Sequence, residues 1–316
     1  MILTLSGCQE QSIHPEPQQH DTQPAEVNRT QTKTTAKQKI AKPAVISLID
    51  PRTSQTVQTI MPKALGYETD EELYEAQLKK MAKDLARGTD TSTGYDQTME
   101  LDRLAENGQI IKGNPGVILK ESELVDRILN ASENGGDVQL PLYEMMSHYQ
   151  LEEIPALNEV VIASYTTYFQ VSEQGRSKNI ELSASALNNI IVGVGDYFSF
   201  NTMVGERTEE KGYQQAYEIV NKQLVLGIGG GICQTSSTLF NAVDQMTVRI
   251  TERHHHSLSV GYVPGGRDAT VSYGTLDFKF QNTSGVPYLI KTFYKAGALT
   301  IEIRTANYYK TMLEHS

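Results

Sequence analysis

Cys233 ends a glycine-rich run and opens a stretch of small polar residues. The chain reads Gly-Ile-Gly-Gly-Gly-Ile-Cys-Gln-Thr-Ser-Ser from Gly227 to Ser237. Because glycine weakens regular elements, four glycines in five positions predict a tight turn or a close approach of backbone to another group. The residues that follow, to Val243, predict a short helix with Cys233 at or near its N-terminus. Unpaired N–H groups and the helix dipole at that end favour a thiolate.

Histidines and an acid follow this cysteine in the chain, as Cys-His acyl transfer requires. His254 and His256 are two residues apart, so on a strand they would share one face, and either could act as the base. The charged residues beside His254 favour it slightly. Asp268 is the candidate that orients the base. Its alternative role is that of a turn residue after Gly265 and Gly266.

Cys233 has two other interpretations. A free cysteine is often a small buried hydrophobe, which needs no chemistry. It could also bind a metal together with His254 and His256, because three ligands with an open position suit catalytic zinc. The nucleophile is the favoured interpretation, and no metal or other cofactor is predicted.

Polar residues around the glycine run are candidates for ligand binding. The backbone N–H of Cys233 and the side chain of Gln234 would supply oxyanion donors. Arg207 and Arg253 would each bind a carboxylate through two hydrogen bonds; their alternative is an ion pair with a neighbouring glutamate. The predicted ligand-binding residues are Arg207, Gly229, Gly230, Gly231, Gln234, Ser236 and Arg253.

The N-terminus has the pattern of a lipid-attachment signal; the alternative is an apolar N-terminus with an incidental cysteine. Leu-Ser-Gly-Cys, ending at Cys8, has the apolar and small residues of a bacterial lipoprotein box. The following residues are mostly Gln, Thr, Pro, Lys and Glu, which cannot bury enough apolar surface to fold. We therefore expect lipidation of Cys8, a disordered tether and an extracytoplasmic, membrane-anchored location in the bacterial cell envelope.

Composition narrows the class of protein further. The chain has 316 residues, which favours two domains, and its net charge of −10 argues against a nucleic-acid partner. Its apolar runs are too short for a membrane-spanning helix. We expect an α+β fold, with a small α+β N-terminal domain before a mixed, mostly antiparallel, β-rich domain with a few helices. The expected segments are a truncated signal at 1–8, a linker at 9–44, domains at 45–159 and 160–306, and a tail at 307–316.

Local patterns predict elements in both domains. Thr69 and Glu72 form a capping box that begins a helix reaching about residue 86. In the second domain, apolar spacing predicts a helix over 177–191, and alternation predicts a strand over 256–262. Two short strands flank residues 221–222, as in a two-residue hairpin.

Residues 189–279 resemble the VanW family. The matching sequence motifs, called the family words below, are Gly195–Asn201, Val204–Thr208, Gly212–Tyr213, Gly227–Gln234, Ser236–Leu239, Glu252–His254, His256–Ser257, Tyr262–Pro264 and Asp268–Val271. His255 lies between the matching histidines and is not part of these words. Residues 75–160 resemble the peptidoglycan-binding domain that commonly precedes VanW domains. The resemblance implies a place in the bacterial envelope but no reaction.

Together these patterns predict an envelope-anchored, VanW-like protein that acts on or binds peptidoglycan. Its expected partners are peptidoglycan or its stem peptide and, through the lipid, the membrane. If it is an enzyme, it is a cysteine-dependent acyl transferase or a peptidase or amidase. The first alternative is a non-catalytic, wall-binding lipoprotein, and the second is a Cys/His metal site.

Overall fold

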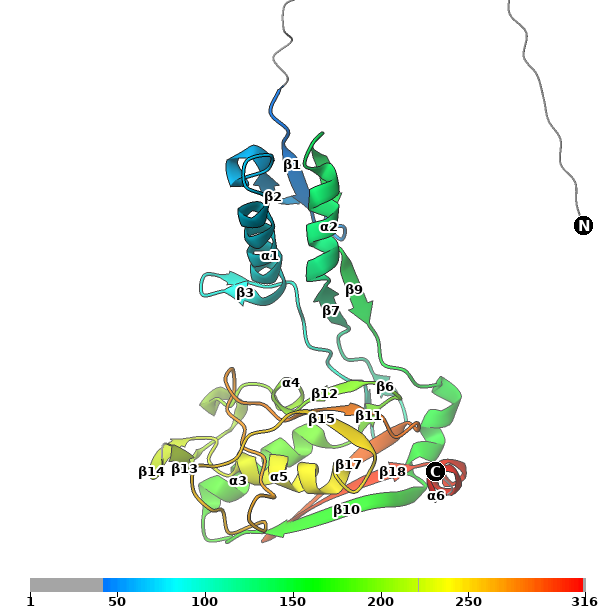
Figure 1. Ribbon diagram of the computed structural model, residues 1–316. Helices are drawn as coiled ribbons and strands as arrows, with labels where there is room; N and C mark the ends of the chain where they lie inside the picture. The colour runs from blue at the N-terminus through cyan, green and yellow to red at the C-terminus, as the bar shows by residue number, and fades with distance from the viewer. Residues whose placement is uncertain (1–41, 221, 315–316) are drawn as a thin grey trace, which may run out of the picture. The chain divides into compact units, whose positions relative to one another are not determined.

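The computed structural model describes residues 42–220 and 222–314 (Figure 1). The predicted lipid-attachment residue Cys8 and nearly all of the predicted tether lie outside these residues. From Pro43 onward the chain forms one compact unit of helices and mostly antiparallel strands, which confirms the mixed α+β class. Among the described residues, no helix has both the length and the apolar character needed to cross a membrane.

The N-terminal part has a three-stranded sheet covered by two helices. The central strand β1 (Ile46–Ile49) pairs antiparallel with β2 (Thr56–Ile60) and parallel with β8 (Gly136–Gln139). Helices α1 (Glu71–Arg87) and α2 (Glu121–Ala131) bury their apolar stripes in the same core as this sheet. The shorter elements here are η1 (Pro62–Leu65), β3 (Gly88–Thr89), β4 (Ser92–Thr93), β7 (Gly116–Leu119) and β9 (Leu142–Met145).

Helix α1 begins one residue later than the capping box predicts. The side chain of Asp70 caps it by accepting a hydrogen bond of 2.9 Å from the backbone N–H of Leu73. Thr69 instead donates its hydroxyl to the carbonyl of Gly66. The prediction of Thr69 as the cap is therefore wrong, because two adjacent residues were able to cap and the acid does so.

A six-stranded antiparallel sheet forms the centre of the C-terminal part. Its order is β10 (Val160–Tyr168), β18 (Ala298–Thr305), β17 (Tyr288–Lys295), β11 (Ile190–Val192), β5 (Arg103–Leu104) and β6 (Ile110–Ile111). The last two strands come from residues that the sequence assigned to the first domain. The sheet thus draws strands from both sides of the predicted boundary at residue 160, and that boundary stays a prediction.

Helices α3 (Gln174–Leu187) and α5 (Ile232–Val243) pack against this sheet, as Figure 1 shows. Side chains alternate along strands, so Ile190 joins the large core with these helices while Ile191 joins a small cluster with η2 (Leu151–Asn158). Helix α3 begins three residues before the predicted range of 177–191 and ends four residues before the end of that range. It ends at Leu187, because Asn189 adopts a left-handed φ of 65° and the chain then enters β11.

The remaining elements form a second sheet, a hairpin and two short helices. A second sheet has the order β12 (Tyr197–Ser199), β16 (Lys279–Asn282) and β15 (Val248–Glu252), and the predicted hairpin is confirmed as β13 (Gln215–Val220) and β14 (Gln223–Ile228). The short helices are α4 (Phe200–Val204) and η3 (Glu209–Lys211).

The strand predicted over residues 256–262 does not form: these residues adopt bends and irregular backbone without ladder pairing. Residues 307–314, within the predicted C-terminal tail, form helix α6 (Asn307–Glu314).

Candidate functional site

The glycine run forms the tight turn that leads into α5. Gly229 and Gly231 have φ values of 97° and 107°, which residues with a β-carbon rarely adopt. Gly230 is needed for another reason: a β-carbon there would lie 2.6 Å from the carbonyl oxygen of Ala216 on β13. The run therefore brings two backbone segments together, and it places Cys233 in the first turn of α5, as predicted.

The thiol of Cys233 is not ionised by its helix position. Burial raises the pKa of the Cys233 thiol, and the opposing effects of its hydrogen bond and of nearby arginines are smaller. The sulfur donates to the carbonyl oxygen of Val271 over 3.4 Å. The residue retains partial exposure but packs against the large core. In this arrangement the thiol is neutral, so any nucleophilic role requires a base.

The segment from Asp268 to Val271 runs along the first part of α5. Ser236 donates to the carbonyl of Ala269 over 2.5 Å, and the N–H of Ala269 donates to the hydroxyl of Ser237 over 2.9 Å. Val271 at the end of this segment accepts the thiol hydrogen. Hydrogen bonds of Ala269 and Val271 with α5 therefore fix the segment that joins Asp268 to the contact with Cys233. Ser236, a predicted ligand-binding residue, uses its hydroxyl inside the protein.

Asp268 holds two histidines. His255 Nδ1 donates to one carboxylate oxygen over 2.8 Å, while His256 donates both its Nδ1 and its backbone N–H to the other, each over 2.7 Å. Burial alone would raise the pKa of Asp268, but these hydrogen bonds outweigh it and lower the pKa to about 2. The side chain of His256 is only 6% exposed. Sequence reasoning missed His255, because it stands outside the matched family words.

His254 lies in a different environment. Its Nε2 is 3.0 Å from a carboxylate oxygen of Glu252, and its carbonyl accepts a hydrogen bond from the N–H of Thr270. Lys279 also contacts Glu252, at 2.9 Å. His254 and His256 therefore have different acids as partners, Glu252 and Asp268. His256, and not His254, is hydrogen-bonded to Asp268, the acid that the sequence predicts to orient the base.

Tyr262 connects the histidine cluster to α5. Its ring lies edge-on to the His256 ring, with centroids 6.5 Å apart, and its hydroxyl is hydrogen-bonded to Ser237. The guanidinium carbon of Arg176 also lies over the Tyr262 ring, 5.7 Å from its centroid. Burial strongly raises the pKa of Tyr262, so the phenol stays protonated. The matched family words contain Tyr262, but nothing in the sequence indicated this position.

Gln234, the predicted oxyanion donor, has both amide hydrogens engaged. Its Nε2 lies 3.0 Å from the hydroxyl of Thr167 and from the carbonyl of Tyr168. Its carbonyl oxygen accepts from Arg176 over 2.7 Å. A catalytic role for Gln234 stays a prediction, and it would require one of these bonds to break.

The two candidate arginines differ. Arg253 stacks on Phe240 at 4.1 Å and contacts His255 Nε2 at 3.0 Å. Arg207 has both terminal nitrogens buried without a hydrogen-bond partner, and burial lowers the pKa of its guanidinium. Within the described chain, neither arginine forms an ion pair with Glu206 or Glu252.

Glu218 on β13 is a site residue that the sequence did not indicate. Its side chain occupies the space that a side chain on Gly227 would fill. Burial raises the pKa of the Glu218 carboxyl, and its charge acts on the Cys233 thiol. In the sequence, the only indication was the glycine at position 227, and a glycine does not show which side chain fills the space beside it.

The predicted metal alternative has no geometric support. In the described ranges, no group of three or more His, Cys, Asp and Glu side chains is arranged to hold a metal ion. Cys233, His254 and His256 instead contact Val271, Glu252 and Asp268, respectively.

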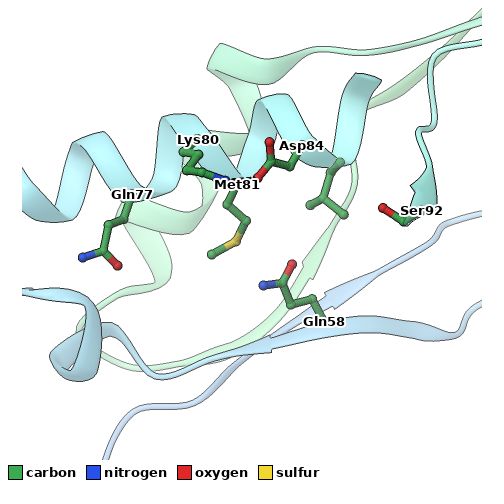
Figure 2. Close-up of a pocket in the computed structure, with 7 residues that line it drawn as sticks. Gln58, Gln77, Lys80, Met81, Asp84 and Ser92 are labelled. Carbon is green, nitrogen blue, oxygen red and sulfur yellow. Dashed lines mark hydrogen bonds and ion pairs between the residues drawn. The ribbon is translucent and has the colours of Figure 1, made fainter. Parts of the chain in front are cut away.

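A pocket open to solvent lies elsewhere, between α1 and β2 in the N-terminal part (Figure 2). Figure 2 shows two glutamine carboxamides and an ion pair between Lys80 and Asp84 along its wall. The residues that line it are Gln58, Gln77, Lys80, Met81, Asp84, Leu85 and Ser92. None of the predicted site residues lines this pocket.

Comparisons with known proteins agree with the C-terminal motifs. The family model described as VanW like protein matches residues 175–304. An uncharacterised Bacillus subtilis protein, YoaR, is 39% identical over 212 residues, covering 66% of this chain and 70% of that protein. The Enterococcus faecalis vancomycin B-type resistance protein VanW is 28% identical over 130 residues, covering 40% of this chain and 47% of that protein. No solved structure gives a significant match.

Proposed function

Because the chain belongs to the VanW family, we propose that it acts in the bacterial cell wall, where it binds peptidoglycan and uses Cys233 for acyl transfer or amide hydrolysis. The observation that carries this proposal is that one short segment, packed along α5, contacts both the Cys233 thiol and His256. The segment that begins at Asp268, which holds His256, ends at Val271, which contacts the thiol. The name of the VanW relative, a vancomycin resistance protein, accords with a cell-wall role.

The proposed reaction uses His256 as the base. With Nδ1 donating to Asp268, Nε2 of the neutral ring is an acceptor. It takes the thiol proton as sulfur bonds to the carbonyl carbon of a peptide. The C–N bond then breaks, the leaving amine takes that proton, and a thioester remains. Water or an acceptor amine attacks the thioester and restores the thiol.

A second function, non-catalytic wall binding, is favoured by one observation. The pKa of the Cys233 thiol is raised rather than lowered, and the thiol donates a hydrogen bond to a backbone carbonyl. Inert structural cysteines have this environment. In that case the same surface would bind peptidoglycan without forming a covalent bond.

The pH dependence of thiol alkylation separates these functions. We expect His256→Ala to raise the apparent pKa of Cys233 by more than one unit, about 1.4 kcal/mol, in iodoacetamide reactions with the folded protein. His254→Ala is the matched control and should leave the pKa unchanged, because its partner is Glu252. If neither variant changes the thiol pKa, the catalytic function is wrong and wall binding becomes the better proposal.

We also propose that a lipid on Cys8 anchors the protein outside the cytoplasm, through the tether predicted from its composition. The N-terminal α+β part would add a second contact to peptidoglycan, as its resemblance suggests. Membrane partitioning of Cys8→Ala, made with a complete export signal, tests the anchor. Retention of this variant in the membrane would contradict it.

A further inference from the structure

The guanidinium of Arg207 is a charged group in the site without a partner. Both terminal nitrogens are buried and make no hydrogen bond. The rings of Phe200 and Tyr273 flank it, at 5.7 and 5.6 Å. Aromatic faces attract a cation but do not satisfy its N–H groups. Buried arginine donors are normally paired, and these two nitrogens lack a partner within the described chain.

The glycine turn brings Arg207 close to Cys233. A β-carbon on Gly229 would lie 3.3 Å from Cβ of Arg207, so the bare backbone lets the arginine cross the turn. The charge of Arg207 acts on the thiol and opposes the rise of its pKa. Asp277 is an acid whose charge also reaches Arg207, but its carboxylate already accepts hydrogen bonds from Ser199 and from the backbone of Asn201.

One turn carries the ring that lies over Arg207. Residues 272–276 form it through hydrogen bonds between Ser272 and Leu276, and Tyr273 near its tip is 52% exposed while its ring lies over Arg207. Val271, just before the turn, accepts the thiol hydrogen. The side chain of Asn201 fixes the base of the turn by donating to the carbonyls of Ser272 and Leu276. The ring is therefore the exposed part of a turn whose base is held by hydrogen bonds.

We infer that Arg207 is the binding site for a free carboxylate of a peptide ligand, and that Tyr273 covers it until the ligand enters. A planar guanidinium with two unpaired nitrogens matches a carboxylate bidentately. This inference rests on the proposed function and defines its substrate: peptidoglycan whose stem peptide has a free carboxyl group next to the bond that Cys233 attacks.

The test measures binding of soluble peptidoglycan fragments, released from purified walls by a muramidase, before and after amidation of their carboxyl groups. The parent protein should bind the free acids at least 10-fold more tightly than the amidated fragments. Arg207→Met should remove this difference, and Arg207→Lys should restore only part of it. Arg249→Met, which removes an exposed arginine bonded to Tyr197 and Gln281, is the control. Thermal unfolding confirms that each variant is folded.

Tyr273→Ala tests the cover over Arg207 separately. Removing the ring should uncover the guanidinium and strengthen binding of the acid fragments several-fold. Equal binding of acid and amide fragments by the parent would overturn the inference, as would competition by millimolar inorganic phosphate, which would indicate a general anion site.

The two proposals fail separately. Acid-selective binding that depends on Arg207, without any effect of His256→Ala on the thiol, leaves the carboxylate site standing and removes catalysis. A His256-dependent thiol with equal binding by the parent and Arg207→Met removes only the carboxylate site.

Discussion

The Asp268 cluster and the Arg207 guanidinium lie around the same short helix, and they differ in how their charges are met. Asp268 receives three hydrogen bonds from two histidines. Arg207 donates none from its terminal nitrogens and lies between two aromatic rings. The acid is thus complete in the free protein, whereas the arginine awaits a partner. A charge satisfied within the chain serves the fold, whereas one left unsatisfied carries a stability cost that a bound ligand would offset.

The largest expected effect is that of Asp268→Asn. The amide would offer N–H groups to histidine donors and remove a buried charge, so we expect the free energy of unfolding to fall by about 2–4 kcal/mol. Urea unfolding at pH 7 measures it. Because the carboxyl pKa falls from 3.8 to about 2 on folding, the contribution of Asp268 is complete above pH about 4 and is lost as pH falls towards 2. The Asn variant should lack this acid-dependent loss.

Arg207→Met is the matched contrast in the same unfolding measurement. It replaces an unpaired buried charge with an apolar side chain of similar length, so stability should stay equal or rise by about 1 kcal/mol. A loss of 2 kcal/mol or more would show that Arg207 is paired in solution. The contrast between a structural acid and a ligand-binding cation would then fail.

Some of the site follows from local sequence patterns. The glycine run and the apolar spacing after it correctly predict a helix with Cys233 in its first turn. The hairpin around residues 221–222 is also confirmed, because its register follows from two flanking strands and a short turn. These features depend on neighbours in the chain, which is the information that a sequence displays directly.

Other parts depend on packing between distant segments. The strand expected over 256–262 does not form. At its start, the backbone N–H of His256 donates a hydrogen bond to Asp268 instead of to a neighbouring strand. No local pattern reveals that this acid binds His255 and His256 rather than His254. The contact of Tyr262 with His256 and that of Glu218 with Gly227 could not be predicted either, because each joins residues that only the fold brings together.

Gly230→Val tests how firmly the turn holds the two regions together. Its β-carbon would lie 2.6 Å from the carbonyl oxygen of Ala216 and 2.7 Å from that of Tyr217, and neither backbone oxygen can move freely. We expect a loss of about 1–3 kcal/mol in unfolding free energy. Gly265→Ala is the control, because a β-carbon there meets no atom within 4 Å. Equal stability of both variants would show that the turn is a flexible loop.

Glu218→Gln should have the smallest effect, and it probes the unsatisfied side of the comparison. The charge of Glu218 raises the pKa of the Cys233 thiol while that of Arg207 lowers it. Removing the negative charge should therefore lower the apparent thiol pKa by a few tenths of a unit, about 0.5 kcal/mol, in the alkylation titration. Glu209→Gln, at an exposed residue of η3, should leave the thiol pKa unchanged.

The direction of this change distinguishes two roles for the carboxyl group. A fall in thiol pKa means that Glu218 only repels the thiolate, and His256 remains the candidate base. A rise would mean that the Glu218 carboxylate accepts the thiol proton itself, because a lost acceptor destabilises the ionised sulfur. The base would then lie on β13 beside Cys233, and the Asp268 cluster would be left with a purely structural role in holding residues 255–271 against α5.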